Sequence, residues 1–246
     1  MAPLSGKSAL VTGASRGIGA AIAKRLAKDG ANVALTYSSS PERARQVAEE
    51  IAKEGGRALA IQADAADQAA VRAAVQQTAK EFGSIDILVN NAGVLALGPI
   101  ADFPADEFER ALAVNVRSVF TAIQETLRHM PDGGRIITIG SVNSERMPFP
   151  GGAVYALTKG AVASFTKGLA RDLGERKITV NNIQPGPVDT EANPASGAFA
   201  ETMLGLMALK RYGHADEIAA MAAYLAGPEA GYITGASLLI DGGFAA

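Results

Sequence analysis

Residues 8–19 of the chain read SALVTGASRGIG, and this stretch decides the fold. Residues 8–12 form a short apolar run that predicts a buried strand, and the Ala-rich residues 19–29 predict a helix. Between them, Gly13, Gly17 and Gly19 allow a tight turn and a close approach of the backbone to a pyrophosphate, which the free N–H groups of the helix would also bind. The spacing is G-x-x-x-G-x-G, a variant of the dinucleotide-binding fingerprint. A purely structural glycine-rich turn is the alternative.

The same alternation of short apolar runs and longer helical stretches continues to the end of the chain. Further strands are expected over 31–37, 57–63, 85–89, 135–139, 178–183 and 237–241. Helices are expected from Pro41 and over 67–82, 104–128 and 153–174. Strands that are apolar on both faces and separated by helices indicate a parallel sheet covered on both sides. The sequence therefore predicts an α/β fold: one Rossmann-like, doubly wound parallel sheet of about seven strands in a single domain over 1–246.

Two stretches interrupt this alternation, 141–153 and 187–213, and both follow the carboxyl ends of expected strands. Open α/β sheets bind ligands at that edge, so these stretches are predicted to be substrate loops. The first contains the stiff apolar segment Met147-Pro148-Phe149-Pro150, and the second contains a recurring Met/Leu pattern. Together they suggest that the substrate is a small or medium, mainly apolar ketone or alcohol. The pattern comprises Met203, Leu204, Leu206 and Met207, which suit either a lid over the substrate or a core or oligomer contact.

Composition excludes several function classes. The chain has 246 residues, a net charge of −2 and no cysteine, so a disulfide scaffold and a thiol nucleophile are ruled out. No basic run suggests nucleic acid or an anionic membrane as a partner, and no metal-ligand motif appears. The first residues lack a signal-peptide pattern, and no apolar run approaches about 18 residues. A cytoplasmic protein that acts on a small molecule is expected.

Residues 13–17 also match G-x-S-x-G, the nucleophile elbow of hydrolases. A hydrolase needs a histidine delivered on a loop at the top of the sheet. His129 lies at an expected helix end before Pro131, and His214 begins another helix, so both are interpreted as surface or capping residues. The hydrolase interpretation is therefore disfavoured.

Tyr155 and Lys159 are four residues apart on an expected helix, so the phenol and the ammonium lie on one face. The lysine cation is expected to lower the pKa of the phenol and to make Tyr155 an acid–base group near neutrality. Ser141 ends an expected strand 14 residues earlier and can hydrogen-bond a substrate oxygen held beside Tyr155.

The end of the second expected strand indicates which nicotinamide cofactor fits. An acidic residue there would bind the adenosine ribose and repel a 2′-phosphate, but the chain reads Leu-Thr-Tyr-Ser-Ser over 35–39. Arg16 lies in the nearby glycine-rich turn, and a solvated surface charge is the alternative for it. A cation with neutral hydroxyl donors suits a phosphate, so NADP(H) is predicted over NAD(H).

Several motifs follow one another along the chain: Thr12, Gly13, Gly17 and Gly19; Asn90 to Gly93; Asn115; Ser141; Tyr155 and Lys159; and Asn182 to Gly186. Together they resemble the short-chain dehydrogenase/reductase family, and the match runs along the whole chain in the family's order. Within the family, the chain is similar to the 3-oxoacyl-(acyl-carrier-protein) reductase-like enzymes. A subgroup of bacterial oxidoreductases linked to biofilm dispersal is further resembled by Gly140 to Asn143, Arg146 to Pro148, Gln184 to Pro187, and Asn193 with Pro194.

The resemblance implies roles for individual residues. Tyr155 would exchange a proton with the substrate oxygen, Ser141 would position that oxygen, and Lys159 would bind the nicotinamide ribose. Asn115 would hold a water that links Lys159 to bulk solvent. The expected cofactor-binding residues are Gly13, Ser15, Arg16, Gly17, Ile18, Gly19, Tyr37, Ser38, Ser39, Asp64, Asn91, Ala92, Gly93, Tyr155, Lys159, Pro185, Gly186, Val188 and Thr190.

Some alternatives stay open at this point. Asp64 would either meet the adenine amino group or form the N-cap of the 67–82 helix. Few basic residues flank the fifth expected strand, which disfavours a substrate that is attached to an acidic carrier protein.

The second function hypothesis is a nucleotide-binding regulator on the same fold with little turnover. Family members form tetramers, and the Ala-rich 154–171 helix permits close approach of a partner helix, so a homo-oligomer is expected.

Overall fold

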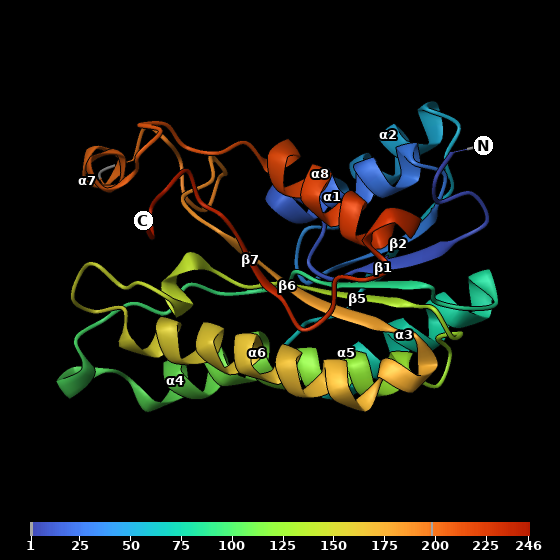
Figure 1. The fold of residues 1–246 in the computed structure, drawn as a ribbon, viewed down its shortest axis with the longest axis horizontal. Helices are drawn as coiled ribbons and strands as arrows, with labels where there is room; N and C mark the ends of the chain where they lie inside the picture. The colour runs from blue at the N-terminus through green and yellow to red at the C-terminus, as the bar shows by residue number, and fades with distance from the viewer. Residues whose placement is uncertain (1, 198) are drawn as a thin grey trace.

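The computed structural model describes residues 2–197 and 199–246, and in them seven strands form one parallel sheet in the order β3-β2-β1-β4-β5-β6-β7 (Figure 1). The chain winds outward from β1 in one direction and then from β4 in the other, so the strand order reverses between β1 and β4. The strands are β1 Ser8–Val11, β2 Asn32–Tyr37, β3 Ala58–Gln62, β4 Ile87–Asn90, β5 Arg135–Ile139, β6 Thr179–Pro185 and β7 Ser237–Ile240.

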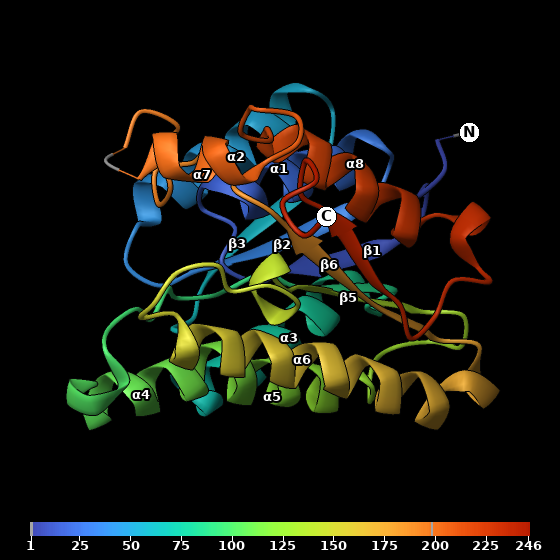
Figure 2. The ribbon, with the colours of Figure 1, turned by 60° about the vertical axis from the view of Figure 1, so that its left-hand side comes forward.

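Helices cover both faces of this sheet (Figures 1 and 2). On one face lie α1 Gly17–Lys28, α2 Pro41–Lys53 and α8 Ala215–Ala226; on the other lie α3 Gln68–Phe82, α4 Ala105–Leu112, α5 Ser118–Thr126 and α6 Ala153–Asp172. Successive strand residues point to opposite faces, so Val11 belongs to the same apolar cluster as Ile22 of α1, while Leu10 belongs to the cluster of Val75 of α3 on the other face. Both faces are apolar for this reason. The predicted fold class is confirmed.

One expected element is wrong. The single helix over 104–128 is interrupted by a π-helical turn, Ala113–Arg117, between α4 and α5. A π turn widens the helix by one residue and re-aims the side chains within it. Here it buries Asn115, whose side-chain amide hydrogen-bonds both the backbone N–H and the carbonyl oxygen of Val94. Every other predicted boundary lies within two residues of the observed one.

The two predicted substrate loops pack against each other and against the end of the chain. The second loop contains α7 Ala200–Leu206 and the buried Met207, which form a small apolar cluster with Val142 of the first loop and Phe244. Met203, Leu204 and Leu206 are partly buried in the same cluster. The Met/Leu pattern is therefore a local core beside the cleft, and the C-terminal residues belong to it.

In the described residues, no helix is both long enough and apolar enough to cross a bilayer. The cytoplasmic location and the single domain stay predictions.

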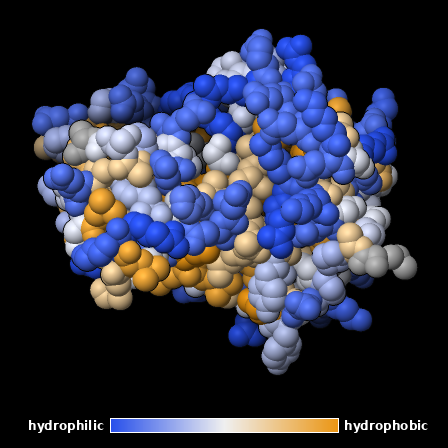
Figure 3. Space-filling model, turned by 90° about the horizontal axis from the view of Figure 1, so that it is seen from above, coloured by the Kyte–Doolittle hydropathy of each residue, from blue (hydrophilic) through white to orange (hydrophobic). Residues whose placement is uncertain are grey.

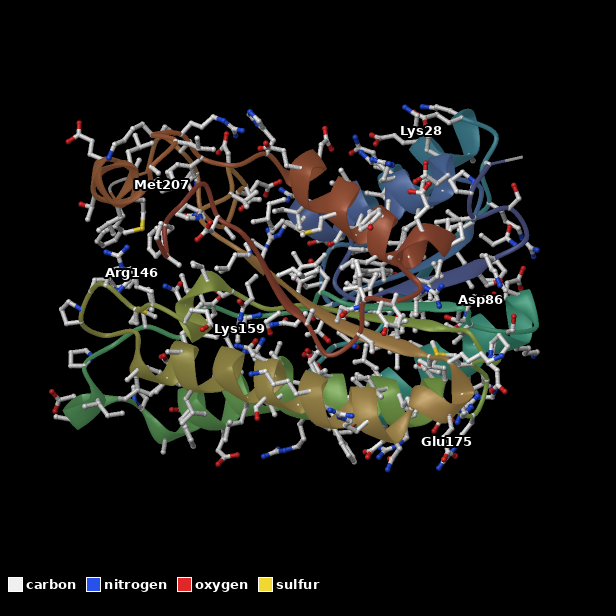
Figure 4. All side chains as sticks on the ribbon, in the orientation of Figure 1. Lys28, Asp86, Arg146, Lys159, Glu175 and Met207 are labelled. Carbon is white, nitrogen blue, oxygen red and sulfur yellow. The ribbon has the colours of Figure 1, made fainter. Side chains whose placement is uncertain are left out.

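Asp86 ties the start of β1 to the start of β4. Figure 4 shows Asp86 at one end of the molecule and Arg146 at the other, with Lys159 between them. Its carboxylate accepts hydrogen bonds from the Ser8 backbone N–H at 3.0 Å and from Lys7 Nζ at 2.9 Å. The carboxylate is almost fully buried, so removing it would leave the buried Ser8 N–H without that partner.

We therefore predict that Asp86→Ala lowers the free energy of unfolding by about 1–3 kcal/mol, the cost of an unsatisfied buried polar group. Urea unfolding measures the change. Asp132→Ala is the matched control, because Asp132 is 71% exposed and its ion pair with Arg176 should contribute less than about 1 kcal/mol. Equal losses in the two variants would contradict this account of the sheet's amino-terminal edge.

Candidate active site

A cleft of about 1060 Å³ opens at the carboxyl edge of the sheet, across the point where the strand order reverses. Its walls come from the turn after β1, the ends of β2, β4, β5 and β6, and the two predicted substrate loops. This volume is at the upper end for small-molecule sites, and it is enough for an extended ligand together with a second molecule.

All the cofactor-binding residues expected from the sequence line this cleft, which brings together side chains from separate segments of the chain. They are Gly13, Ser15, Arg16, Gly17, Ile18, Gly19, Tyr37, Ser38, Ser39, Asp64, Asn91, Ala92, Gly93, Tyr155, Lys159, Pro185, Gly186, Val188 and Thr190.

The glycine-rich turn is shaped to receive a phosphate group. Gly13 has φ +63°, and a Cβ there would lie 2.8 Å from Ala92 Cα, so only glycine fits. At Gly19, a Cβ would lie 2.7 Å from the Gly13 carbonyl oxygen. The N-terminus of α1 has no side-chain cap and no acidic residue in its first turn, so its N–H groups and positive dipole end are available to an anion. These features fit the pyrophosphate of a dinucleotide.

Hydrogen bonds from the neighbouring strands fix this turn. Thr36 Oγ1 of β2 accepts from Gly13 N at 3.0 Å, and Thr12 Oγ1 accepts from Asn91 N at 3.0 Å and Ala92 N at 3.1 Å. The Asn91 amide donates to the Thr12 and Gly13 carbonyl oxygens, both at 2.9 Å. Although Asn91 lines the cleft, its side chain is committed to the backbone of the turn.

Asp64 lines the cleft and is not the N-cap of α3, so the capping alternative is wrong. Its carboxylate accepts from Ala66 N at 3.0 Å in the turn after β3. The N-cap is Asp67, which accepts from the N–H groups of Ala69 and Ala70. Two aspartates three residues apart offer the same capping signal, and only the length of the preceding turn decides between them.

Arg16 lies at the cleft edge and contacts an acidic residue that sequence reasoning missed. Its guanidinium is 3.5 Å from the carboxylate of Glu191, in the second substrate loop, and Arg43 of α2 hydrogen-bonds the same carboxylate. Arg43 is also a residue that sequence reasoning missed. No sequence signal links Arg43 to Glu191, because 148 residues separate them.

Ser141, Tyr155 and Lys159 also line the cleft, separate from the glycine-rich turn. Figure 4 labels Lys159 on α6. Ser141 follows β5, is 7% exposed, and its Oγ accepts from Asn143 N at 3.1 Å. One helical turn separates Tyr155 from Lys159 on α6, and the Lys159 Nζ lies 5.8 Å from the centre of the Tyr155 ring. The ammonium donates to the Ile139 carbonyl oxygen at 2.9 Å.

Burial controls the pKa values of both groups. It raises the pKa of Tyr155 above its ordinary value, and a hydrogen bond with Ser141 opposes the increase. The expected lowering of the phenol's pKa by Lys159 is therefore outweighed here by desolvation. Burial lowers the pKa of Lys159 to about 8. Both shifts favour the neutral forms of the two side chains.

Asn115 does not line the cleft but lies directly behind its wall. Its Oδ1 accepts from Val94 N at 2.8 Å, and its Nδ2 donates to the Val94 oxygen at 2.9 Å and to Thr158 Oγ1 at 3.1 Å. Thr158 precedes Lys159 on α6, so Asn115 ties the segment after β4, which contains Val94, to the helix that carries the lysine.

The part of the cleft between the two predicted substrate loops is lined by apolar side chains, several of which sequence reasoning missed. Figure 3 shows apolar residues gathered toward the end of the molecule that carries α7, whereas the opposite end is mainly hydrophilic. Among the apolar lining residues that sequence reasoning missed are Leu95, Leu97, Phe199 and Phe244. Phe199 is 74% exposed and Leu95 61% exposed at the rim, as is typical of a binding surface for an apolar ligand.

Neither histidine lines the cleft, so the hydrolase interpretation has no general base. His214 is the N-cap of α8 and shares a capping box with Glu217, whose carboxylate accepts from His214 N at 2.8 Å. His129 lies beside Glu125 of α5. Within residues 2–197 and 199–246, no three His, Cys, Asp or Glu side chains come together as a metal site would require.

Comparison with known proteins identifies the family. The family model described as Enoyl-(Acyl carrier protein) reductase matches residues 13–245. The Cyclic-di-GMP-binding biofilm dispersal mediator protein of Escherichia coli (strain K12) is 46% identical over 246 residues, all of both chains. A 3-oxoacyl-(acyl-carrier-protein) reductase of Staphylococcus aureus (strain N315) is 41% identical over 240 residues, 96% of this chain and 97% of that one.

One of the similar solved structures contains NADP. A short-chain dehydrogenase from Burkholderia cenocepacia J2315, in complex with NADP, superposes with a TM-score of 0.98 at 53% identity, over 99% of this chain and 100% of that one. The chain therefore belongs to the short-chain dehydrogenase/reductase family of oxidoreductases, as its sequence motifs suggested.

The buried Lys159 predicts a pH-dependent stability. Its pKa is about 8 in the folded chain and 10.5 ordinarily, so between pH 8 and 10 the unfolded chain holds a proton that the folded chain has released. Over this window the free energy of unfolding of the wild type should rise relative to Lys159→Met, by at most about 1.4 kcal/mol per pH unit. Above pH 10 the raised pKa of Tyr155 acts in the opposite direction.

Denaturant unfolding of the ligand-free protein at several pH values measures this slope. Lys167→Met is the control, because Lys167 is exposed on the same helix and its loss should leave the wild-type pH dependence intact. A constant difference between wild type and Lys159→Met across pH 8 to 10 would show that Lys159 is not desolvated as described.

Proposed function

We propose that the protein is an NADP(H)-dependent oxidoreductase that reduces a ketone to an alcohol or runs the reverse reaction. The observation that carries this proposal is the arrangement of one cleft: a phosphate-binding glycine turn at one part, and Ser141, Tyr155 and Lys159 beside an apolar pocket at the other. Hydride transfer to a carbonyl needs these two parts in contact.

The residues of this chain fit NADP(H). The α1 N-terminus would hold the pyrophosphate, Asp64 would meet the adenine, and Pro185 to Thr190 would flank the nicotinamide. The end of β2 carries no acidic residue, while Arg16 lies close by with hydroxyl side chains, which favours a 2′-phosphate. When bound, the cofactor supplies or accepts the hydride. The NADP complex of the B. cenocepacia relative supports this assignment.

The protein's own groups would handle the proton. In reduction, Ser141 Oγ donates a hydrogen bond to the carbonyl oxygen, and Tyr155 donates its phenolic proton to that oxygen as the alcohol forms. The raised pKa of Tyr155 keeps the phenol protonated near neutral pH, which is the form that reduction requires. The Lys159 ammonium, 5.8 Å from the ring centre, stabilises the phenolate left behind. Asn115 fixes the position of Val94 relative to α6 through its hydrogen bonds to Val94 and Thr158. It would also hold the water through which a proton from solvent returns to Tyr155.

The cleft favours a small or medium, mainly apolar ketone. Leu95, Leu97, Phe149, Phe199, Met203 and Phe244 line its substrate end, so most of the substrate's contacts would be apolar. The turn before β5, which the sequence flanks with Arg128 and Arg135, lies at the amino edge of the sheet, away from the cleft at the carboxyl edge. Its charge therefore does not bear on whether an acidic carrier protein delivers the substrate, and the sequence-based objection to a carrier does not hold.

A second candidate function is that of a nucleotide-binding regulator with little turnover. It rests on the name of the E. coli relative, which describes that protein as cyclic-di-GMP-binding, and on Arg16 and Arg43, whose guanidinium groups suit a phosphodiester. A regulator of this kind has no use for an acid–base tyrosine, so the Tyr155 experiment below distinguishes the two functions.

We also propose a homo-oligomer. Leu157 of α6 and Phe120 of α5 are 51% and 47% exposed, which leaves apolar side chains on the outer surface of both helices. A Cβ placed at Gly160 or Gly168 of α6 would meet no atom within 4 Å, so the helix has open space there for a partner helix.

Light scattering tests the oligomer. At micromolar concentration we expect a mass that is a multiple of 25.2 kDa, and Leu157→Glu should shift it toward 25.2 kDa because a buried unpaired charge weakens an apolar interface. Leu209→Glu, which changes an exposed leucine elsewhere on the surface, is the control. A wild-type mass of 25.2 kDa would contradict the proposal.

Tyr155→Phe tests the chemistry. Losing the phenolic proton should lower NADPH-dependent turnover of the best ketone in a panel by about 10²-fold or more, the usual contribution of a general acid, while the variant still binds NADPH. Tyr232→Phe, which changes a fully exposed tyrosine in the same way, should keep wild-type turnover. Retention of most activity in Tyr155→Phe would overturn the assigned mechanism, and a wild type without turnover on any ketone would favour the regulator.

A further inference from the structure

Two arginines from separate elements converge on one carboxylate at the edge of the cleft. Arg16, the N-cap residue of α1, lies 3.5 Å from Glu191, and Arg43, in the first turn of α2, hydrogen-bonds the same carboxylate. The three side chains are about half exposed, at 56%, 46% and 56% for Arg16, Arg43 and Glu191. Arg16 and Glu191 both line the cleft, and Arg43 adjoins it.

The position of this cluster matches the place of the 2′-phosphate. The cleft wall next to Arg16 is formed by Tyr37 and the hydroxyl-bearing Ser38, Ser39 and Ser40, which follow β2 and lead into α2. This is where the ribose next to the adenine must lie in a doubly wound fold. The first turn of α2, which carries Arg43, begins directly after these serines.

The charges of the cluster are not balanced. Two guanidinium groups face a single carboxylate, so the cluster carries one excess positive charge. A phosphate monoester carries a charge of about −1.5 to −2 and three acceptor oxygens, so it matches two arginines better than a carboxylate does. Both arginines and Glu191 are exposed, and ion pairs of this kind contribute little to stability, so an incoming phosphate can displace the carboxylate.

We propose that Arg43 is a second specificity-determining residue for the 2′-phosphate, and that Glu191 is an internal anion that competes with this phosphate for both arginines. This inference rests on the proposed use of NADP(H). It adds the first turn of α2 and the second substrate loop to the two segments already assigned to cofactor discrimination, the glycine-rich turn and the end of β2.

The test is calorimetric titration of the full-length protein with the adenosine halves of the two cofactors, adenosine 2′,5′-bisphosphate and 5′-AMP. Arg43→Ala should weaken the bisphosphate by about tenfold, roughly one charge-assisted hydrogen bond at an exposed site, and leave 5′-AMP unchanged. Glu191→Gln should strengthen the bisphosphate by about twofold to fivefold, because its competitor is gone, and again leave 5′-AMP unchanged.

Matched controls come from neighbouring positions. Arg45→Ala removes an exposed arginine two residues along α2, and Glu201→Gln neutralises an exposed glutamate of α7 in the same loop as Glu191. Both controls should bind the two probes as the wild type does. The inference is overturned if Arg43→Ala behaves like Arg45→Ala, if it weakens both probes equally, or if Glu191→Gln fails to strengthen the bisphosphate.

The same titrations separate this inference from the proposed function. A wild type that binds adenosine 2′,5′-bisphosphate no better than 5′-AMP overturns both the NADP(H) preference and the role of Arg43. A wild type that prefers the bisphosphate while the Arg43 and Glu191 variants match their controls overturns only the inference. The loss of turnover in Tyr155→Phe bears on the chemistry alone.

Discussion

The hydrogen bonds that hold the turn at Gly13 set the geometry on which the rest of the site depends. Thr36 from β2 and Asn91 from the end of β4 bind the backbone of this turn from both sides, at 2.9–3.0 Å. The turn therefore lies where the strand order reverses, and it directs the N-terminus of α1 into the cleft. Because Gly13 and Gly19 are in contact with neighbouring backbone and side chains, a larger residue at either position would displace that helix.

A second constraint acts where the chemistry is proposed, and it is desolvation. Tyr155 and Lys159 line the same cleft as the two predicted substrate loops, and burial raises the pKa of the phenol and lowers that of the ammonium to about 8. Near neutral pH the phenol is thus a proton donor and the lysine is largely charged, a combination that suits reduction of a carbonyl. The structural contacts of Asn115 explain how α6 holds both residues in place: the π turn aims this side chain at Val94 and at Thr158, next to Lys159.

The sequence predicted the sheet and the membership of the cleft because both follow from local patterns. Apolar runs bounded by helices specify a parallel sheet, and residues after strand ends must gather at one edge, so Ser38, Asn91, Ser141 and Gly186 could be placed together. The π turn was missed because its residues have ordinary helical patterning, and only tertiary contacts with Val94 favour the wider turn. The pairing of Arg43 with Glu191 and the position of Phe244 depend on how long loops fold back, which no periodic signal encodes.

In the proposed reaction, the cleft brings a nicotinamide and a carbonyl together beside Tyr155. The most direct measurement is mass spectrometry of the alcohol formed from an apolar ketone with NADPH that carries deuterium at the transferable C4 position. We expect one deuterium on the carbinol carbon of each alcohol molecule, with the hydroxyl proton drawn from solvent through Tyr155. Oxidation of the labelled NADPH without deuterated alcohol would contradict it.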